Sequence, residues 1–170
     1  MIVAARAIRV RAVIAQMPFF GVAARPRLGD AVRFGVVIGA DRVRRLLRLQ
    51  PRYIPLVSGP GRVAAMTTDE ADRIVDSFRG TSWNNEVSAG VLLELSRYRP
   101  VEHAAATAPL LVCIGEDDSL TPRSLVDALV ATAPNCELKV LPIGHFGLDD
   151  PTEHAALTAV QLDFLDRALC

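Results

Sequence analysis

Two short stretches in the last third of the chain carry residues that could do acid–base chemistry. An apolar run at 110–114 ends in a turn that holds Asp118, and a second run at 138–142 ends near His145. A carboxylate that accepts the Nδ1 proton of an imidazole fixes its tautomer and stabilises the imidazolium formed when the ring takes a proton from a serine. An acid after one strand and a histidine after the next therefore indicate two members of a Ser-His-Asp triad.

Alternatives stay open for these residues. Asp117 is the acid if the turn is one residue longer. A Gly-x-x-Asp after a strand is often only a helix cap, and an isolated Gly-His-Phe carries little information, but the two together in this order favour the triad. His103 lies in a polar connector and is expected on the surface, and His154 is expected to be exposed in the first turn of a helix.

The serine that a triad needs is not evident in the sequence. G-x-S-x-G, the turn that carries this nucleophile in α/β enzymes, does not occur in the 170 residues. The nearest approach is Ser82, but Asn84 is too large for a turn in which strand and helix backbones nearly touch, and the residues before it have a helical pattern. Ser58 lies in a loop with no helix after it. The sequence thus predicts an acid and a base without their nucleophile.

The elements that must position Asp118 and His145 form a strand–helix–strand–helix unit. After the strand at 110–114, Thr121 is expected to cap a helix that has Pro122 at its first position and runs to about Thr132. A strand is expected at 137–141, and a final helix follows from an Asp150 cap to about Leu169. Such a unit implies parallel strands joined by a right-handed crossover. Because reactive groups collect beyond the carboxyl ends of parallel strands, the two side chains should meet there.

The first hundred residues divide into two parts. Residues 10–20 predict a buried strand that runs into a turn at 17–21, whereas 22–108 show helical periods and Pro and Gly breaks. Three helices are expected there: from an Asp30 cap to about Leu49, from a capping box at 67–70 to about Phe78, and from Glu86 to Arg97. The run at 35–41 could instead form a strand and a tight turn.

Composition excludes several classes of protein. The chain is 51% apolar and 22% charged, which argues against disorder, and its 19 basic and 19 acidic residues give no basic surface for nucleic acid. Cys113, Cys136 and Cys170 are spaced for neither a metal nor a disulfide framework. No apolar run reaches the length of a membrane span. A cytoplasmic protein without metal, cofactor, membrane or nucleic-acid partner is expected.

The motifs resemble the C-terminal portion of an α/β-hydrolase with a helical cap, of the serine-aminopeptidase, X-Pro-peptidase and dienelactone-hydrolase kind. Residues 10–19 resemble the sixth strand of that fold, 109–122 the seventh strand with its acid loop, and 138–146 the eighth strand with its histidine loop. The helix around 161–165 resembles the closing helix. Two further segments, at 83–86 and 98–100, are similar to the cap of bacterial members.

The resemblance implies a partial α/β-hydrolase fold of about three parallel strands with flanking helices. Residues 1–21 and 101–170 would form the core and 22–100 the helical cap. The implied activity is that of a serine hydrolase for esters, amides or short peptides. Its catalytic residues would be Asp118 and His145, and its substrate would contact the turn after the first strand, at Met17, Phe19 and Phe20.

The first five strands, the oxyanion hole and the serine of complete members would all lie before Met1. The chain alone should then be inactive. The alternative is an interaction module that self-associates or pairs with a partner. Its contact would be the edge of the strand at 10–19, because an unpaired strand edge presents free backbone donors and acceptors.

Overall fold

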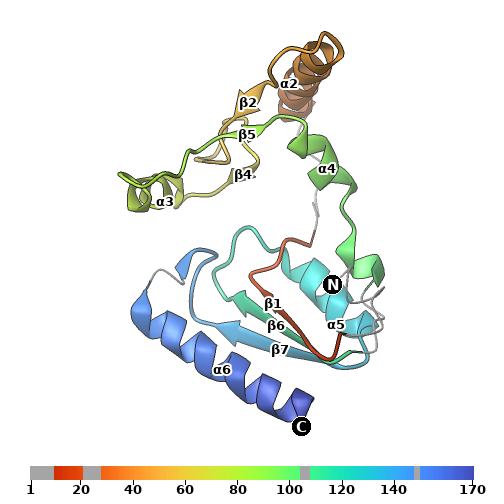
Figure 1. Ribbon diagram of the computed structural model, residues 1–170, viewed down its shortest axis with the longest axis vertical. Coiled ribbons are helices and arrows are strands. Elements are labelled where there is room, and N and C mark those ends of the chain that lie inside the picture. The colour runs from red at the N-terminus through yellow and green to blue at the C-terminus, as the bar shows by residue number, and fades with distance from the viewer. Residues whose placement is uncertain (1–9, 21–27, 104–107, 148–149) are drawn as a thin grey trace. The chain divides into compact units, whose positions relative to one another are not determined.

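The computed structural model describes residues 10–20, 28–103, 108–147 and 150–170 (Figure 1). The chain divides into two compact units. One consists of Met1–Ala23 together with Arg99–Cys170, and the other consists of Ala24–Tyr98. We call them the sheet unit and the inserted unit and describe each by itself.

A three-stranded parallel sheet forms the centre of the sheet unit. Its strands are β1 (Val13–Gln16), β6 (Leu110–Gly115) and β7 (Cys136–Leu141), in the order β1-β6-β7. Val13 lies opposite Leu110 in the register, and Leu110 lies opposite Cys136. All six residues of β6 are buried, as expected for the middle strand of a parallel sheet. The predicted fold class, three parallel strands with flanking helices, is confirmed.

Two helices pack on opposite faces of this sheet (Figure 1): α5 (Arg123–Thr132), which connects β6 to β7, and α6 (Pro151–Leu169). Successive residues of a strand point to opposite faces, so β6 contributes to two cores. The α5 core consists of Phe20, Leu110, Val112, Ile114, Val126, Leu129 and Ala133. The α6 core consists of Leu111, Cys113, Leu141, Ile143, Leu157 and Phe164. Burial on both faces fixes the position of β6, and therefore of the turn that follows it.

Of the two predicted helix caps, the one at α6 forms and the one at α5 does not. Asp150 caps α6 as expected: its carboxylate accepts hydrogen bonds from the backbone N–H groups of Thr152 (2.7 Å) and Glu153 (3.3 Å). At α5 the predicted Thr121 cap is wrong. Pro122 occupies the cap position in an extended conformation without a side-chain bond, while the Thr121 hydroxyl donates to the Pro18 carbonyl at 3.5 Å. The hydroxyl therefore connects the acid loop to the turn after β1.

Strand β1 is shorter and less buried than predicted. It covers four residues, three of them only half-buried and the last exposed. Within the described residues it pairs with β6 alone. A strand paired on one side loses the second ladder that would extend and bury it.

The described part of the inserted unit, residues 28–98, contains three helices and two small sheets. The helices are α2 (Leu28–Leu46), α3 (Ala71–Ser77) and α4 (Val91–Arg97), followed by the single turn η1 (Pro100–His103) at the start of the second sheet-unit segment. The strands are β2 (Tyr53–Ile54), β3 (Val57–Ser58), β4 (Met66–Thr67) and β5 (Val87–Ser88). β2 pairs with β5 antiparallel and β3 with β4 parallel.

Several local predictions in this unit are wrong. Residues 35–41 lie inside α2 and form no strand, and Asp30 lies in the first turn of that helix. The predicted capping box at 67–70 does not form, since no side chain caps α3; the Thr68 hydroxyl instead accepts from the backbone N–H of Glu70 (3.2 Å). Residues 86–90 precede α4 as strand and turn, because pairing with β2 competes there with helix formation.

A buried carboxylate holds the start of the inserted unit together. Asp41 on α2 is 1% exposed. It accepts hydrogen bonds from the Arg45 guanidinium and from the backbone N–H of Arg52, both at 2.8 Å. A buried charge is tolerated only when it is paired in this way. The contact joins the two ends of the turn that follows α2.

Among the described helices, not one combines the length and the apolarity that crossing a membrane would require.

Candidate active site

The loops that follow β6 and β7 are joined by backbone hydrogen bonds. We call residues 116–121 the acid loop and residues 142–147 the histidine loop. The backbone N–H of Glu116 donates to the Leu141 carbonyl at 2.7 Å, and that of Asp117 donates to the Ile143 carbonyl at 3.2 Å. Because β6 and β7 are parallel, both loops leave the same edge of the sheet. Their relative position is therefore set by the backbone and not only by side chains.

Asp118 and His145 are in direct contact at this edge. The His145 Nδ1 atom lies 2.9 Å from Oδ2 and 3.0 Å from Oδ1 of Asp118. The Asp118 side chain is 1% exposed and the His145 side chain 16%. An ionised carboxylate only accepts hydrogen bonds, so Nδ1 must be the protonated nitrogen of the ring. In the neutral ring this leaves Nε2 as the proton acceptor.

The backbone keeps the Asp118 carboxylate charged and oriented. Its Oδ1 also accepts from the backbone N–H groups of Leu120 (2.8 Å) and Thr121 (2.9 Å). Burial by itself raises the pKa of Asp118, but the hydrogen bonds from His145, Thr121 and Leu120 outweigh it, so that the pKa of this carboxyl lies below its ordinary value. Asp118 is thus an anion at neutral pH.

Two glycines allow the observed backbone path at this site. A Cβ on Gly115 would lie 2.2 Å from the Ile143 carbonyl oxygen, and a Cβ on Gly147 would lie 2.7 Å from the Ile143 Cβ. Neither distance is sterically possible, so a side chain at Gly115 would push the histidine loop away from β6, and one at Gly147 would distort the histidine loop itself. Gly115 is the glycine of the Gly-x-x-Asp turn that the sequence analysis considered. Gly147 was not considered there, although it lies three residues after Gly144 of the Gly-His-Phe motif.

Asp117 and His154 are exposed, unlike the contacting atoms of Asp118 and His145. Asp117 is exposed, and its backbone N–H is the group that bonds Ile143. His154 is exposed in the first turn of α6. His103 ends η1. The carboxylate that the fold brings to His145 is therefore that of Asp118.

The turn after β1 reaches the same sheet edge, and its predicted substrate-contacting residues have different environments. The backbone N–H of Met17 donates to the Cys113 carbonyl at 2.9 Å, and Met17 has a φ of 40°, which is uncommon outside glycine. Its side chain packs partly against the α6 core. Phe19 is half-buried. Phe20 is 2% exposed and belongs to the α5 core, so its side chain packs inside the sheet unit and anchors the turn.

The serines considered as nucleophiles lack the strand–turn–helix setting. Ser82 is exposed and follows helix α3 and a turn. Ser58 ends β3 and donates its hydroxyl hydrogen to the adjacent Gly59 carbonyl at 3.2 Å. Both belong to the inserted unit, whereas Asp118 and His145 belong to the sheet unit.

Over the described residues there is no group of three or more His, Cys, Asp or Glu side chains that could hold a metal ion. The three cysteines are free. Burial raises the pKa of the Cys113 thiol, which lies inside β6, so it stays protonated at neutral pH.

Comparison with solved structures identifies the fold. The chain matches the α/β hydrolase GrgF from Penicillium sp. sh18 with a TM-score of 0.76 at 22% identity, covering 97% of this chain and 58% of that one. It matches a Paleococcus ferrophilus monoacylglycerol lipase with a TM-score of 0.62 at 14% identity, covering 95% and 61%. The chain has the fold of the C-terminal portion of an α/β hydrolase, which confirms the resemblance seen in the sequence.

One curated relative is similar at the level of sequence. It is the quorum-quenching protein AidA of Acinetobacter baumannii (strain MDR-ZJ06), 27% identical over 165 residues, which are 94% of this chain and 54% of the relative. The chain thus spans about half the length of that relative. No protein-family model matches the 170-residue chain.

Proposed function

We propose that Asp118 and His145 are the acid and the general base of a serine hydrolase acting on small esters, amides or short peptides. The observation that carries the proposal is the contact between His145 Nδ1 and the Asp118 carboxylate, 2.9 Å from the nearer oxygen, which leaves Nε2 as the proton acceptor. Its support is the α/β-hydrolase fold, in which an acid and a histidine follow successive strands.

In the proposed reaction His145 moves one proton in each half. Nε2 takes the proton of a serine hydroxyl while the serine oxygen attacks the substrate carbonyl, and the imidazolium is stabilised by the buried Asp118 carboxylate. The imidazolium then protonates the leaving alcohol or amine, which restores the neutral ring. We place the serine and the oxyanion-hole donors outside the 170 residues, since no G-x-S-x-G occurs within them.

Substrate would enter beside the turn after β1. Met17 and Phe19 follow the carboxyl end of β1, at the sheet edge that also carries the acid and histidine loops. The inserted unit, residues 24–98, is proposed as the helical cap of the enzyme. The zero net charge argues against a nucleic acid as the substrate. Free cysteines support a reducing compartment such as the cytoplasm.

A fluorophosphonate probe tests the proposal, because only an activated serine reacts with it. The 170-residue chain should neither take up the probe nor hydrolyse nitrophenyl esters. Labelling that disappears in Ser82→Ala and persists in Ser58→Ala would instead identify a serine within the chain and contradict the absent nucleophile.

A chain extended with residues translated from the DNA upstream of the Met1 codon gives the positive test. If it brings a G-x-S-x-G turn, it should take up the probe, and His145→Gln should lower its kcat by about 10³-fold or more. Leu162→Gln, an exposed position on α6, is the matched control and should leave labelling unchanged.

A second candidate function is an interaction module. It is favoured by β1, which pairs on one side only in the described structure. An upstream sequence without either a serine turn or a glycine-rich oxyanion turn would favour this candidate. Pairing of the β1 edge with a partner strand would then be its function.

A further inference from the structure

The outward face of α2 is apolar along its whole length. Six large apolar side chains on or directly after this helix are more than half exposed: Leu28, Val32, Val36, Val43, Leu46 and Leu47. The backbone N–H of Leu47 still bonds the Val43 carbonyl, so this residue continues the helical path. With Gly39 these residues recur every three or four positions and form one stripe, which we call the α2 stripe.

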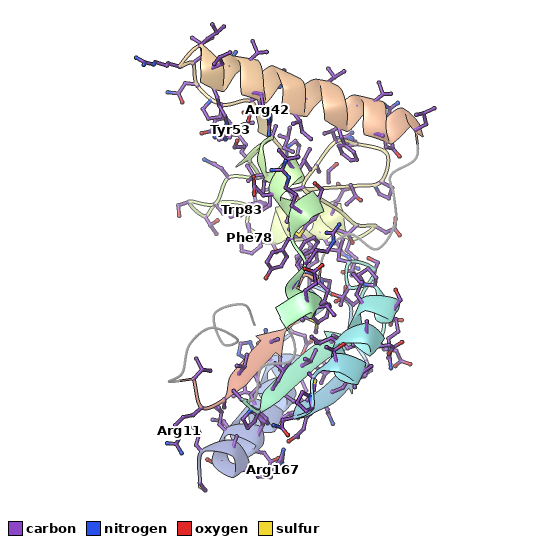
Figure 2. All side chains as sticks on the ribbon, turned by 90° about the vertical axis from the view of Figure 1, so that its right-hand side faces the viewer. Arg11, Arg42, Tyr53, Phe78, Trp83 and Arg167 are labelled. Atoms are coloured by element: carbon purple, nitrogen blue, oxygen red, sulfur yellow. The ribbon has the colours of Figure 1, made fainter. Side chains whose placement is uncertain are left out.

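The stripe lies opposite the face that α2 turns toward its own unit. Phe34, Ile38, Asp41 and Arg45 recur on the inner face at helical spacing, and Asp41 and Arg45 make its polar contacts. In Figure 2 side chains stand out from the outer side of α2, and no other element among the described residues 28–98 covers them. Monomeric proteins rarely leave a continuous apolar face of this length in water.

The order of residues along the stripe is nearly the same in both directions. Three pairs lie at equal distances from the point between Val37 and Ile38: Val36 with Gly39, Val32 with Val43, and Leu28 with Leu47. Each pair joins apolar positions, and the outer two join identical residue types. A two-fold symmetric contact requires a surface that is complementary to itself, and a helix with such a sequence meets this condition when it packs antiparallel on its own copy.

The middle of the stripe is suited to close helix packing. An added Cβ would meet nothing within 4 Å at either Gly35 or Gly39. Small residues four positions apart allow two helix backbones to approach closely. Both glycines lie within three residues of the midpoint, where two crossing helices are nearest to each other.

Charge selects the antiparallel arrangement over the parallel one. Arg42, Arg44, Arg45 and Arg48 crowd the C-terminal end of the helix, and Asp30 lies in its first turn. Arg45 is paired with Asp41, so parallel packing would bring the three other arginines of each copy to the same end of the dimer, whereas antiparallel packing separates them and opposes the helix dipoles. We propose that the α2 stripe is the interface of a two-fold symmetric dimer in which α2 packs antiparallel on α2 of a second copy.

The size of the stripe limits the strength of this dimer. A helix of 19 residues is about 28 Å long, so the stripe buries less than the roughly 800 Å² per partner of a stable complex, and the dimer should be reversible.

Sedimentation velocity of the 170-residue chain over a concentration series tests the interface. Val36→Glu should raise the dissociation constant by more than about tenfold. Leu162→Glu, an exposed leucine on α6, is the matched control and should leave it unchanged. Circular dichroism checks that each variant is folded.

Cross-linking tests the direction of packing, in chains with Cys136→Ser and Cys170→Ser so that the buried Cys113 is the remaining native thiol. A mixture of Val32→Cys and Val43→Cys chains should be joined by a short bis-maleimide, while Val32→Cys chains alone should not. Cross-linking of Val32→Cys chains alone would show parallel packing and overturn the proposal. So would a chain that is monomeric at every concentration, or one whose association is weakened as much by Leu162→Glu as by Val36→Glu. Each of these outcomes is independent of the proposed catalytic role.

Discussion

The carbonyl oxygen of Ile143 occupies the place that a side chain on Gly115 would need. The ideal Cβ position on Gly115 is 2.2 Å from that oxygen. Gly115 is the last residue of β6, and Ile143 lies two residues before His145 in the histidine loop. The absence of a side chain at the end of one strand thus determines how close the histidine can come to the acid.

Gly115→Ala should therefore disturb the Asp118–His145 contact at a distance. The backbone of the histidine loop has to shift, and overpacking of this kind costs about 1–3 kcal/mol of unfolding free energy. NMR of the His145 ring should show the lost Nδ1 contact. Gly59→Ala is the control, because nothing lies within 4 Å of its added Cβ. A Gly115→Ala chain with an unchanged His145 spectrum would contradict this account.

Asp118→Asn should change the tautomer of His145 without unfolding the chain. The asparagine oxygen can still accept from the N–H groups of Leu120 and Thr121, but its amide nitrogen then donates to Nδ1 and moves the ring proton to Nε2. Nitrogen-15 chemical shifts of the ring report the tautomer directly. Asp117→Asn is the matched control, one residue away with an exposed side chain, and should leave the ring unchanged.

The pH dependence of stability should also identify Asp118. Its folded-state pKa lies below the unfolded value of about 3.9, so the folded chain binds this proton less readily than the unfolded chain. The stabilisation is complete above the unfolded pKa and is lost as pH falls through the lowered folded pKa. Denaturation curves from neutral pH down to about pH 3 should thus show a smaller acid destabilisation for Asp118→Asn than for the native chain. If the free energy of unfolding fell equally with pH in the two chains, the contribution of Asp118 would be contradicted.

Phe164 should be a main determinant of the stability of the sheet unit. It is 2% exposed in the α6 core. Phe164→Ala should lower the free energy of unfolding by about 3–5 kcal/mol, because it leaves a cavity between α6 and the sheet. Leu162→Ala on the same helix, where the side chain is 56% exposed, should change it by less than about 0.5 kcal/mol. Circular dichroism during urea titration measures both.

Removal of the buried Asp41 carboxylate should destabilise the inserted unit. Asp41→Ala leaves the backbone N–H of Arg52 without its partner, at a cost of about 1–3 kcal/mol. Trp83 is the single tryptophan of the chain and lies in this unit, 4.9 Å from the ring of Phe78, so its fluorescence follows the unfolding there. Asp30→Ala is the control. It removes an exposed carboxylate 4.0 Å from Arg33 and should change the midpoint of the fluorescence-detected unfolding transition little. Equal shifts for both variants would contradict a special role for Asp41.

Local patterns in the sequence predicted strands β6 and β7 and helix α6 of the sheet unit, but not the extent of β1 or the cap of α5. The run 110–114 is apolar at every position, which is typical of a strand buried on both faces, and the Asp150-Pro151 pair marks the start of α6. The order of acid and histidine after successive strands was visible for the same reason. In the inserted unit the same approach failed at 67–70 and 86–90, where pairing between short, distant segments overrides local propensity.

The sequence by itself determined which residue types follow β6 and β7, because strand burial and turn glycines are encoded within a few positions. Only the tertiary structure decided between Asp117 and Asp118. The backbone N–H of Asp117 bonds the Ile143 carbonyl while Asp118 lies inward against His145. Likewise, the sequence placed Phe20 in the turn after β1, but packing under α5 directed its side chain into the core. The directions of these side chains depend on contacts between segments far apart in the chain, and local sequence patterns do not predict such contacts.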